Sequence, residues 1–185
     1  MGAFGELMDD MDLILDKLSE VDIICGERGV NAEILILGGA GLLLLLETHN
    51  RKFRPTRDID INLLSTNDEE GIRKVLKELA IDVLDGVVEV PPIEDFREQE
   101  KFRIEDAGFE HIKVFVPMIE LLACTKIFSK REKDLQDLQD TDLLDICNKE
   151  KLLAMVNEYK DYLINPNDPD LNYHQLLRIL KQKGL

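Results

Sequence analysis

Residues 33–63 read EILILGGAGLLLLLETHNRKFRPTRDIDINL, and this stretch decides the fold. The apolar run Glu33–Leu37 predicts a buried strand, which the glycine pair at 38–39 ends. Ala40–Thr48 is apolar on every face, which predicts a helix in the middle of the domain. Asp58–Leu63 alternates polar and apolar residues, as in a strand with one polar and one buried face. The stretch therefore predicts a strand, a tight turn into a helix, and a second strand.

The rest of the chain adds helices and strands around this stretch. Apolar residues at helical spacing predict a helix over residues 6–25, and a start signal at 65–68 predicts another over Glu69–Ala80. After Pro117 the pattern is helical, with a break in NPNDPD at 165–170. The other expected elements are strands at Val83–Val90, Lys101–Ile104 and His111–Val116, and helices at Met118–Ser129, Lys133–Cys147, Glu150–Leu163 and Tyr173–Lys183.

This order predicts an α+β fold. A mixed β-sheet core flanked by helices is expected at residues 1–116, and a C-terminal helical portion at 117–185, packed on the core as one unit.

The composition narrows the classes of function. The formal net charge is −15 at pH 7. A surface this acidic repels phosphate backbones, so general nucleic-acid binding and membrane-surface binding are not expected. A local basic patch could still hold a nucleotide or an RNA end.

The three cysteines and the apolar runs bear on location. Cys25, Cys124 and Cys147 are odd in number and lack CxxC spacing, which favours buried thiols in a reducing compartment over disulfides or a zinc site. The N-terminal residues are acidic without a signal-peptide core, and the longest apolar run, Ile34–Leu46, is too short to cross a bilayer. We expect a cytoplasmic protein.

Two carboxylates and two glycines make the strongest candidate for a site. Residues i and i+2 of a strand point to the same face, so Asp58 and Asp60 would lie side by side. Such a pair suits Mg²⁺, which takes one or two carboxylates together with substrate phosphates. Gly38 and Gly39 would let a phosphate approach the backbone at the N-terminus of the next helix.

Basic residues just before the carboxylates could supply the counter-charge. Arg51, Lys52, Arg54 and Arg57 lie within seven residues, and Arg57 directly precedes Asp58. A triphosphate or a nucleic-acid end would be neutralised by this group. The acid-rich run at 134–145 lacks the features of an EF-hand loop and is interpreted as a solvated helix face.

The pattern LGG-A-x-L followed by R-x-T-R-DIDI resembles the Gly-Gly…Asp-x-Asp signature of the polymerase beta-like nucleotidyltransferase superfamily. The stretch LLACTKIFSKREKDLQDL at 121–138 is similar to the Leu-Ala-x-x-Lys and Arg-x-Lys-Asp-x-x-Asp motifs of nucleotidyltransferase-like proteins related to abortive-infection and toxin–antitoxin toxins. The resemblance covers about residues 34–140.

The resemblance implies roles for further residues. Lys126, Arg131 and Lys133 would bind phosphate, and Asp134 would be the active-site acid of the second motif. Active members place a third carboxylate on a later strand, and here the strand at 109–116 offers Glu110. The turn reads Gly-Gly-Ala where catalytic members often carry a hydroxyl.

The sequence leads to two hypotheses of function, beside the possibility of a purely structural α+β protein whose motifs coincide by chance. The first is an enzyme with Mg²⁺ that moves a nucleoside monophosphate from a nucleoside triphosphate to an acceptor hydroxyl on a small molecule, a protein or an RNA end. A toxin or phage-defence role with a cognate antitoxin partner is a form of this hypothesis. The second is a non-catalytic protein that keeps the fold for binding nucleotide or a protein partner.

Overall fold

A computed structural model describes residues 3–51, 53, 54, 56, 58–84, 90–105 and 107–185, with side chains from residue 10 onward. Its centre is a five-stranded sheet with the order β3-β2-β1-β5-β4. The strands β1 and β5 run parallel, as do β2 and β3, whereas β1 pairs antiparallel with β2 and β4 with β5. The sheet is thus mixed, and the predicted α+β class is confirmed.

The elements follow one another as helices and strands up to β5 and as helices after it. In order they are α1 (Ala3–Arg28), β1 (Ala32–Leu37), α2 (Gly38–Thr48), β2 (Asp60–Thr66), α3 (Glu69–Glu78), β3 (Asp82–Val83), α4 (Ile93–Glu98), β4 (Lys101–Arg103), β5 (Ile112–Pro117), α5 (Ile119–Ile127), α6 (Glu132–Asp140), α7 (Leu143–Ile146), α8 (Lys149–Tyr159), the 3₁₀ turns η1 (Lys160–Tyr162) and η2 (Asn172–Gln175), and α9 (Leu176–Gln182).

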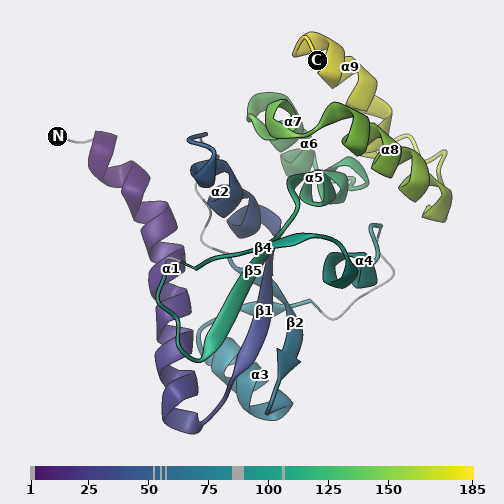
Figure 1. Cartoon of the computed structure of the whole chain (residues 1–185). Helices are drawn as coiled ribbons and strands as arrows, with labels where there is room; N and C mark the ends of the chain where they lie inside the picture. Colours follow the sequence, from purple (N-terminus) through teal and green to yellow (C-terminus); the bar gives the residue numbers. More distant parts are fainter. Residues whose placement is uncertain (1–2, 52, 55, 57, 85–89, 106) are drawn as a thin grey trace.

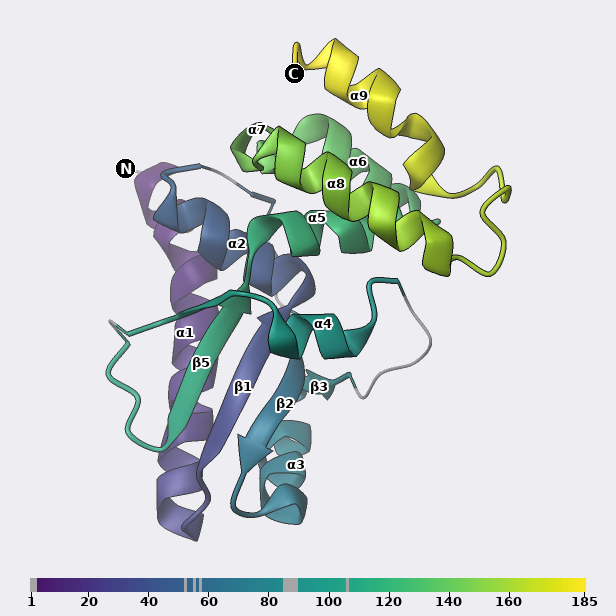
Figure 2. The same ribbon diagram turned by 45° about the vertical axis from the view of Figure 1, so that its right-hand side comes forward.

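Helices cover the two faces of the sheet differently. The helix α1 lies on one side of the sheet and α4 on the other (Figure 1). In the turned view of Figure 2, α1 and α3 lie behind the strands and α4 in front of them. The helices α5–α9 gather beyond the end of the sheet at which β1 and β5 finish (Figure 2). This arrangement leaves the ends of β1 and the start of β2 next to the helical portion.

The alternation in β2 sorts its side chains between the two faces as predicted. Ile59 and Ile61 are 1% and 0% exposed and belong to the core. Asn62 lies on the other face, where Nε of Arg97 on α4 donates to its Oδ1 at 3.0 Å. Asp60 shares that face with Asn62 because successive strand residues alternate.

The helix α2 is largely buried in the core. Residues 40–46 within it are all buried, as its apolar composition on every face predicted. It follows β1 without a loop, so its first residue, Gly38, stands directly at the end of the strand. The packing of α2 therefore fixes the strand end on which the candidate site depends.

Several boundaries differ from those expected. The helix expected at Lys133–Cys147 is divided into α6 and α7, and α4 was not predicted. The strand expected at Val83–Val90 begins one residue earlier, at Asp82, and residues 85–89 lie outside the described residues. In the described part of the chain, no helix is both long enough and apolar enough to cross a membrane.

Candidate functional site

The turn from β1 into α2 lies against the carboxylate of Asp60. Leu37 at the end of β1 pairs with Asp60 at the start of β2. Gly38 has φ +58°, and a Cβ at this position would be 3.1 Å from Oδ2 of Asp60. Only glycine combines this left-handed conformation with so close an approach at no steric cost. The structure thus brings the glycine turn and the carboxylate strand together.

A hydroxyl also reaches this turn, from the loop before β2. A Cβ on Gly39 would be 3.1 Å from Oγ1 of Thr56. Thr56 therefore stands where the Gly-Gly-Ala turn itself lacks a hydroxyl. Sequence reasoning missed this residue because it lies 17 positions after the turn.

The N-terminus of α2 is open to an anion. Among the described residues, no side chain caps this helix, whose N-cap residue is Leu37. The first N–H groups of a helix have no partner within the helix, and they carry its positive dipole end. An 11-residue helix that begins with Gly38-Gly39-Ala40 therefore presents backbone donors beside Asp60.

Asp60 is the electrostatic centre of the site. Partial burial, and then the charges of Asp82 and Asp58, raise its pKa above the ordinary value of 3.8, and the charge of Arg131 opposes this rise. Asp58 is exposed and lies just before β2, whereas the strand was expected to begin at Asp58. The charges of Asp58, Asp82 and Arg131 therefore all act on the Asp60 carboxylate.

Asp82 is the acid that sequence analysis did not find. It is the partner of Asp60 in the parallel pairing of β2 and β3, so their side chains leave the sheet on the same face. The sequence feature that could have indicated it is Ile-Asp-Val at 81–83, an apolar-acid-apolar pattern just after α3. The strand was expected to begin at Val83, which left Asp82 in the preceding loop.

Glu110 does not belong to this group, contrary to expectation. It precedes β5, whose residue Ile112 pairs with Ala32 at the start of β1. Asp60 pairs with Leu37 at the other end of β1. The backbone N–H of Glu110 instead donates to Oδ2 of Asp22 on α1 at 3.1 Å. The two acids are separated by nearly the length of the strand, because β5 and β1 are parallel.

Lys126, which was expected to bind phosphate, is paired inside the protein. Its side chain is only 5% exposed, and its Nζ donates to Oδ1 of Asp134 at 3.1 Å and to Oδ2 of Asp137 at 2.8 Å. The ammonium group also lies 5.8 Å from the centre of the Phe53 ring. Lys126 is thus an internal cation that joins α5 to α6.

Asp134, expected as an active-site acid, is buried in the same network. Its Oδ2 accepts a hydrogen bond from Oγ of Ser129 at 2.6 Å, while Oδ1 takes that from Lys126. Both oxygens are therefore engaged within the protein. The structure gives Asp134 a role in holding the start of α6.

The basic loop before β2 is tied to the helical portion. Nε and Nη2 of Arg54 donate to Oδ1 and Oδ2 of Asp137 at 2.7 and 3.0 Å, and Arg51 pairs with Asp142 at 3.5 Å. Two of the four bases thus pair with acids of the helical portion, Arg54 in a partly buried pair and Arg51 in an exposed one. Lys52 and Arg57 lie outside the described residues, so the expected contact of Arg57 with phosphate stays a prediction.

Arg131 and Lys133 stand at the start of α6 and are exposed. Arg131 is the N-cap residue of this helix, and its charge acts on Asp60. Lys133 lies in the first turn. Of the three cations expected from the second motif, Arg131 is thus an exposed one whose charge lowers the pKa of Asp60.

The donor set was compared with what Mg²⁺ requires. Asp58, Asp60 and Asp82 supply hard oxygen atoms, and the repulsion that raises the pKa of Asp60 would be relieved by a bound cation. Within the described residues, no three His, Cys, Asp or Glu side chains lie close enough to enclose a metal ion. The residues fit a magnesium ion that substrate phosphates and water complete.

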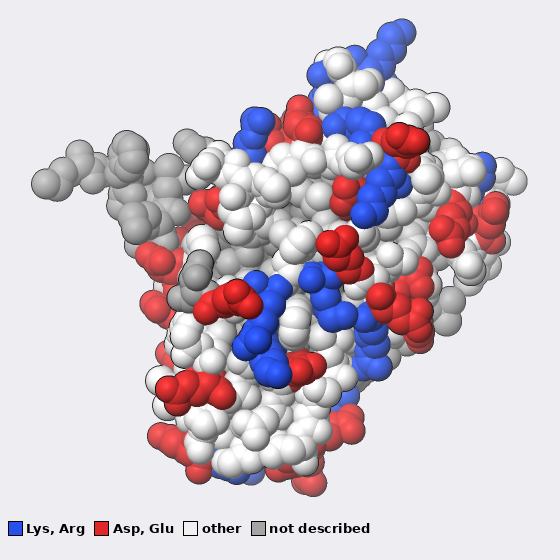
Figure 3. All heavy atoms as spheres, viewed as in Figure 1, with Lys and Arg blue, Asp and Glu red and all other residues white. Residues whose placement is uncertain are grey.

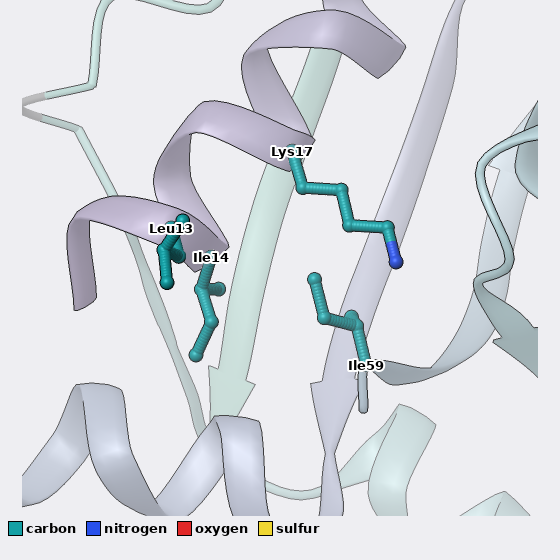
Figure 4. Close-up of a pocket in the computed structure, with 4 residues that line it drawn as sticks. All are labelled: Leu13, Ile14, Lys17 and Ile59. Carbon is teal, nitrogen blue, oxygen red and sulfur yellow. The ribbon is translucent and has the colours of Figure 1, made fainter. Parts of the chain in front are cut away.

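A surface hollow lies away from the carboxylates. It has a volume of about 340 Å³ and is lined by Leu13, Ile14 and Lys17 of α1 and by Ile59 (Figure 4). It is on the α1 side of the sheet, behind the carboxylate face. On the face shown in Figure 3, acidic side chains are spread widely, and Lys and Arg side chains gather near the middle.

The chain belongs to the family described as nucleotidyltransferase of unknown function (DUF6036), which it matches over residues 9–182. The match spans the sheet and nearly all of the helical portion, and it agrees with the superfamily that the glycine turn and the Asp-x-Asp strand indicated. No curated protein and no solved structure matches the chain.

Proposed function

We propose that this protein is a magnesium-dependent nucleotidyltransferase, which moves a nucleoside monophosphate from a nucleoside triphosphate to an acceptor hydroxyl. The observation that carries the proposal is the close approach of the Gly38 backbone to Asp60, where a Cβ added to Gly38 would lie 3.1 Å from Oδ2 of Asp60. It joins a helix N-terminus that can receive phosphate to a carboxylate that can hold a cation. The family membership gives the same class of reaction.

Each group of the site has a role in this reaction. Asp58 and Asp60 would hold Mg²⁺, which neutralises phosphate charge when bound. The backbone N–H groups at the start of α2 and the hydroxyl of Thr56 would receive the β- and γ-phosphates. Arg131 would offset the charge that develops on the leaving pyrophosphate.

The transfer itself forms one bond and breaks another. The acceptor oxygen attacks the α-phosphorus, and the bond from this phosphorus to the oxygen that bridges to the β-phosphate breaks. Pyrophosphate leaves, and the hydroxyl proton passes to a carboxylate. We assign this proton to Asp82, because it is exposed and is the register partner of Asp60.

Isothermal titration of each nucleoside triphosphate, with and without Mg²⁺, tests the proposal. We expect binding that requires Mg²⁺ in the wild type and is lost in Asp60→Asn. Asp161→Asn is the matched control, because Asp161 is an exposed aspartate in η1. An absence of binding to all four triphosphates would refute the proposal.

A second candidate is a protein that binds nucleotide without transferring it. It is favoured by the absence, among the described side chains, of a three-ligand metal group. Release of pyrophosphate with small-molecule, protein or RNA acceptors separates the two candidates. Magnesium-dependent binding without any release would select the second.

A toxin or phage-defence role is a further part of the proposal and rests on the resemblance of the 121–138 motif to toxin-related proteins. Such a protein would need a cognate antitoxin as its partner. Growth arrest on expression of the chain alone, relieved by Asp60→Asn, is the expected result. Normal growth during strong expression would contradict this role.

A further inference from the structure

The turn between α5 and α6, residues 129–131, is held by a residue from the C-terminal segment. The side-chain amide of Asn172 donates to the backbone oxygen of Lys126 at 3.0 Å and to that of Arg131 at 3.2 Å. Its backbone N–H donates to the oxygen of Ser129 at 2.9 Å. One residue thus contacts the chain before, within and at the end of this turn.

Asn172 is buried, with 4% of its surface exposed. A buried amide must satisfy both of its N–H groups, and here each has a backbone carbonyl as its partner. Replacement by alanine would leave these carbonyls without their donor. The contacts are therefore specific to an amide at this position.

Further contacts brace the same turn. Oγ of Ser129 accepts the N–H of Arg131 at 2.9 Å and donates to Asp134 at 2.6 Å. Lys130 forms an ion pair with Asp168, which lies in the same C-terminal segment as Asn172. The contacts of Asn172, Ser129 and Lys130 thus hold the turn that ends at Arg131, while the Arg131 side chain stays exposed.

We propose that Asn172 is a positioning residue, which fixes the 129–131 turn and with it the main chain of Arg131, the cation proposed to offset the charge of the leaving pyrophosphate. The C-terminal segment thereby becomes part of the site, although it lies far from the carboxylates in sequence. The effect of Asn172 on ligand binding rests on the proposed function, whereas its effect on the geometry of the turn is independent of that function.

Hydrogen exchange of the whole chain tests the geometry without any ligand. In Asn172→Ala we expect faster exchange of the backbone amides of residues 129–134, by about tenfold, with the sheet unchanged. Asn157→Ala, an exposed asparagine on α8, is the matched control and should leave these amides unchanged. Unaltered exchange at 129–134, or faster exchange throughout the chain, would overturn the proposal.

Asp168→Asn provides a second variant if the alanine variant does not fold. It removes the ion pair with Lys130 at the same turn and buries no new group. A smaller acceleration at the same amides is expected. Exchange equal to that of the wild type in this variant would count against the braced turn.

A double-mutant cycle with Mg²⁺ and nucleoside triphosphate then tests whether Asn172 acts through Arg131. Asn172→Ala and Arg131→Ala should each weaken binding by about tenfold, and the double variant should bind no more weakly than Arg131→Ala. Additive losses would refute the positioning role. If the wild type binds no triphosphate, the proposed function fails, and hydrogen exchange alone decides whether Asn172 holds the turn.

Discussion

Replacement of Asp137 by asparagine tests the buried ion network that joins the loop before β2 to the helical portion. The carboxylate is 3% exposed and accepts two hydrogen bonds from Arg54 and one from Lys126, at 2.7, 3.0 and 2.8 Å. In the variant, an amide NH₂ group would face one of these cations. The charge that offsets Arg54 would be lost.

The loss of stability follows from the burial of the pair. Removal of one partner from a buried ion pair typically costs about 3 kcal/mol or somewhat more, because the other charge stays buried. For a chain of this size, that corresponds to a fall in the melting temperature of about 6–12 °C. Lys126 keeps Asp134 as a partner, so we expect a loss of stability of about 3 kcal/mol rather than a larger one.

Urea denaturation at pH 7 measures the change in the free energy of unfolding. Glu78→Gln is the matched control, because Arg28 contacts Glu78 through two nitrogen atoms as Arg54 contacts Asp137, but with both side chains about two-fifths exposed. Water screens that pair, so little change is expected. Equal losses in the two variants would refute the reasoning from burial.

The difference between wild type and Asp137→Asn should also depend on pH. Burial raises the pKa of Asp137, but the hydrogen bonds and charges of Arg54 and Lys126 outweigh this, so the pKa lies below the ordinary value of 3.8. A lowered pKa means that the stabilisation is present above pH 3.8 and is lost as the pH falls through the pKa of the folded state. The two proteins should converge in strong acid, and a gap that widens there would contradict the assignment.

Three further predictions concern the site. Gly38→Ala should lower the free energy of unfolding by about 1–2 kcal/mol, because its φ is positive and the added methyl group would approach Asp60. The loss should exceed that of Gly29→Ala, which shares a positive φ but has no atom within 4 Å of the added methyl group. Equal losses in denaturation would contradict the close approach to Asp60. Asp60→Asn should raise the melting temperature at pH 7. The pKa of Asp60 is raised in the folded state, so its ionisation above pH 3.8 destabilises the wild type, and the variant lacks this charge. In a calorimetric pH series, the gain in melting temperature should vanish below pH 3.8. Asp82→Asn should slow the release of pyrophosphate, because Asp82 is the proposed proton acceptor, whereas Glu110→Gln should not; a reversed order would restore Glu110 to the site.

The sequence predicted the local features of the site well. The alternation of Asp58 and Asp60 with two isoleucines placed acids on one face and the core on the other. The glycine pair marked the point at which a strand meets a helix. Both are properties of neighbouring residues, which depend on the backbone period and on side-chain size. Family membership confirmed the superfamily that these motifs indicated.

The three cysteines show the same kind of success. All are buried and free, as their number and spacing predicted. Burial raises the pKa of Cys25 to about 11 and that of Cys147 to about 12, so both stay as thiols at neutral pH.

The tertiary structure alone decided which distant residues meet. Strand register put Asp82 beside Asp60, and the parallel direction of β5 carried Glu110 to the other end of the sheet. The packing of α5 on α6 enclosed Lys126 between two aspartates, although its motif suggested a ligand cation. Pairing and burial depend on which elements pack together, and the energy of a charge depends on whether water or a partner surrounds it. The order of residues along the chain therefore determined the elements and their faces, and the packing determined the membership of the site.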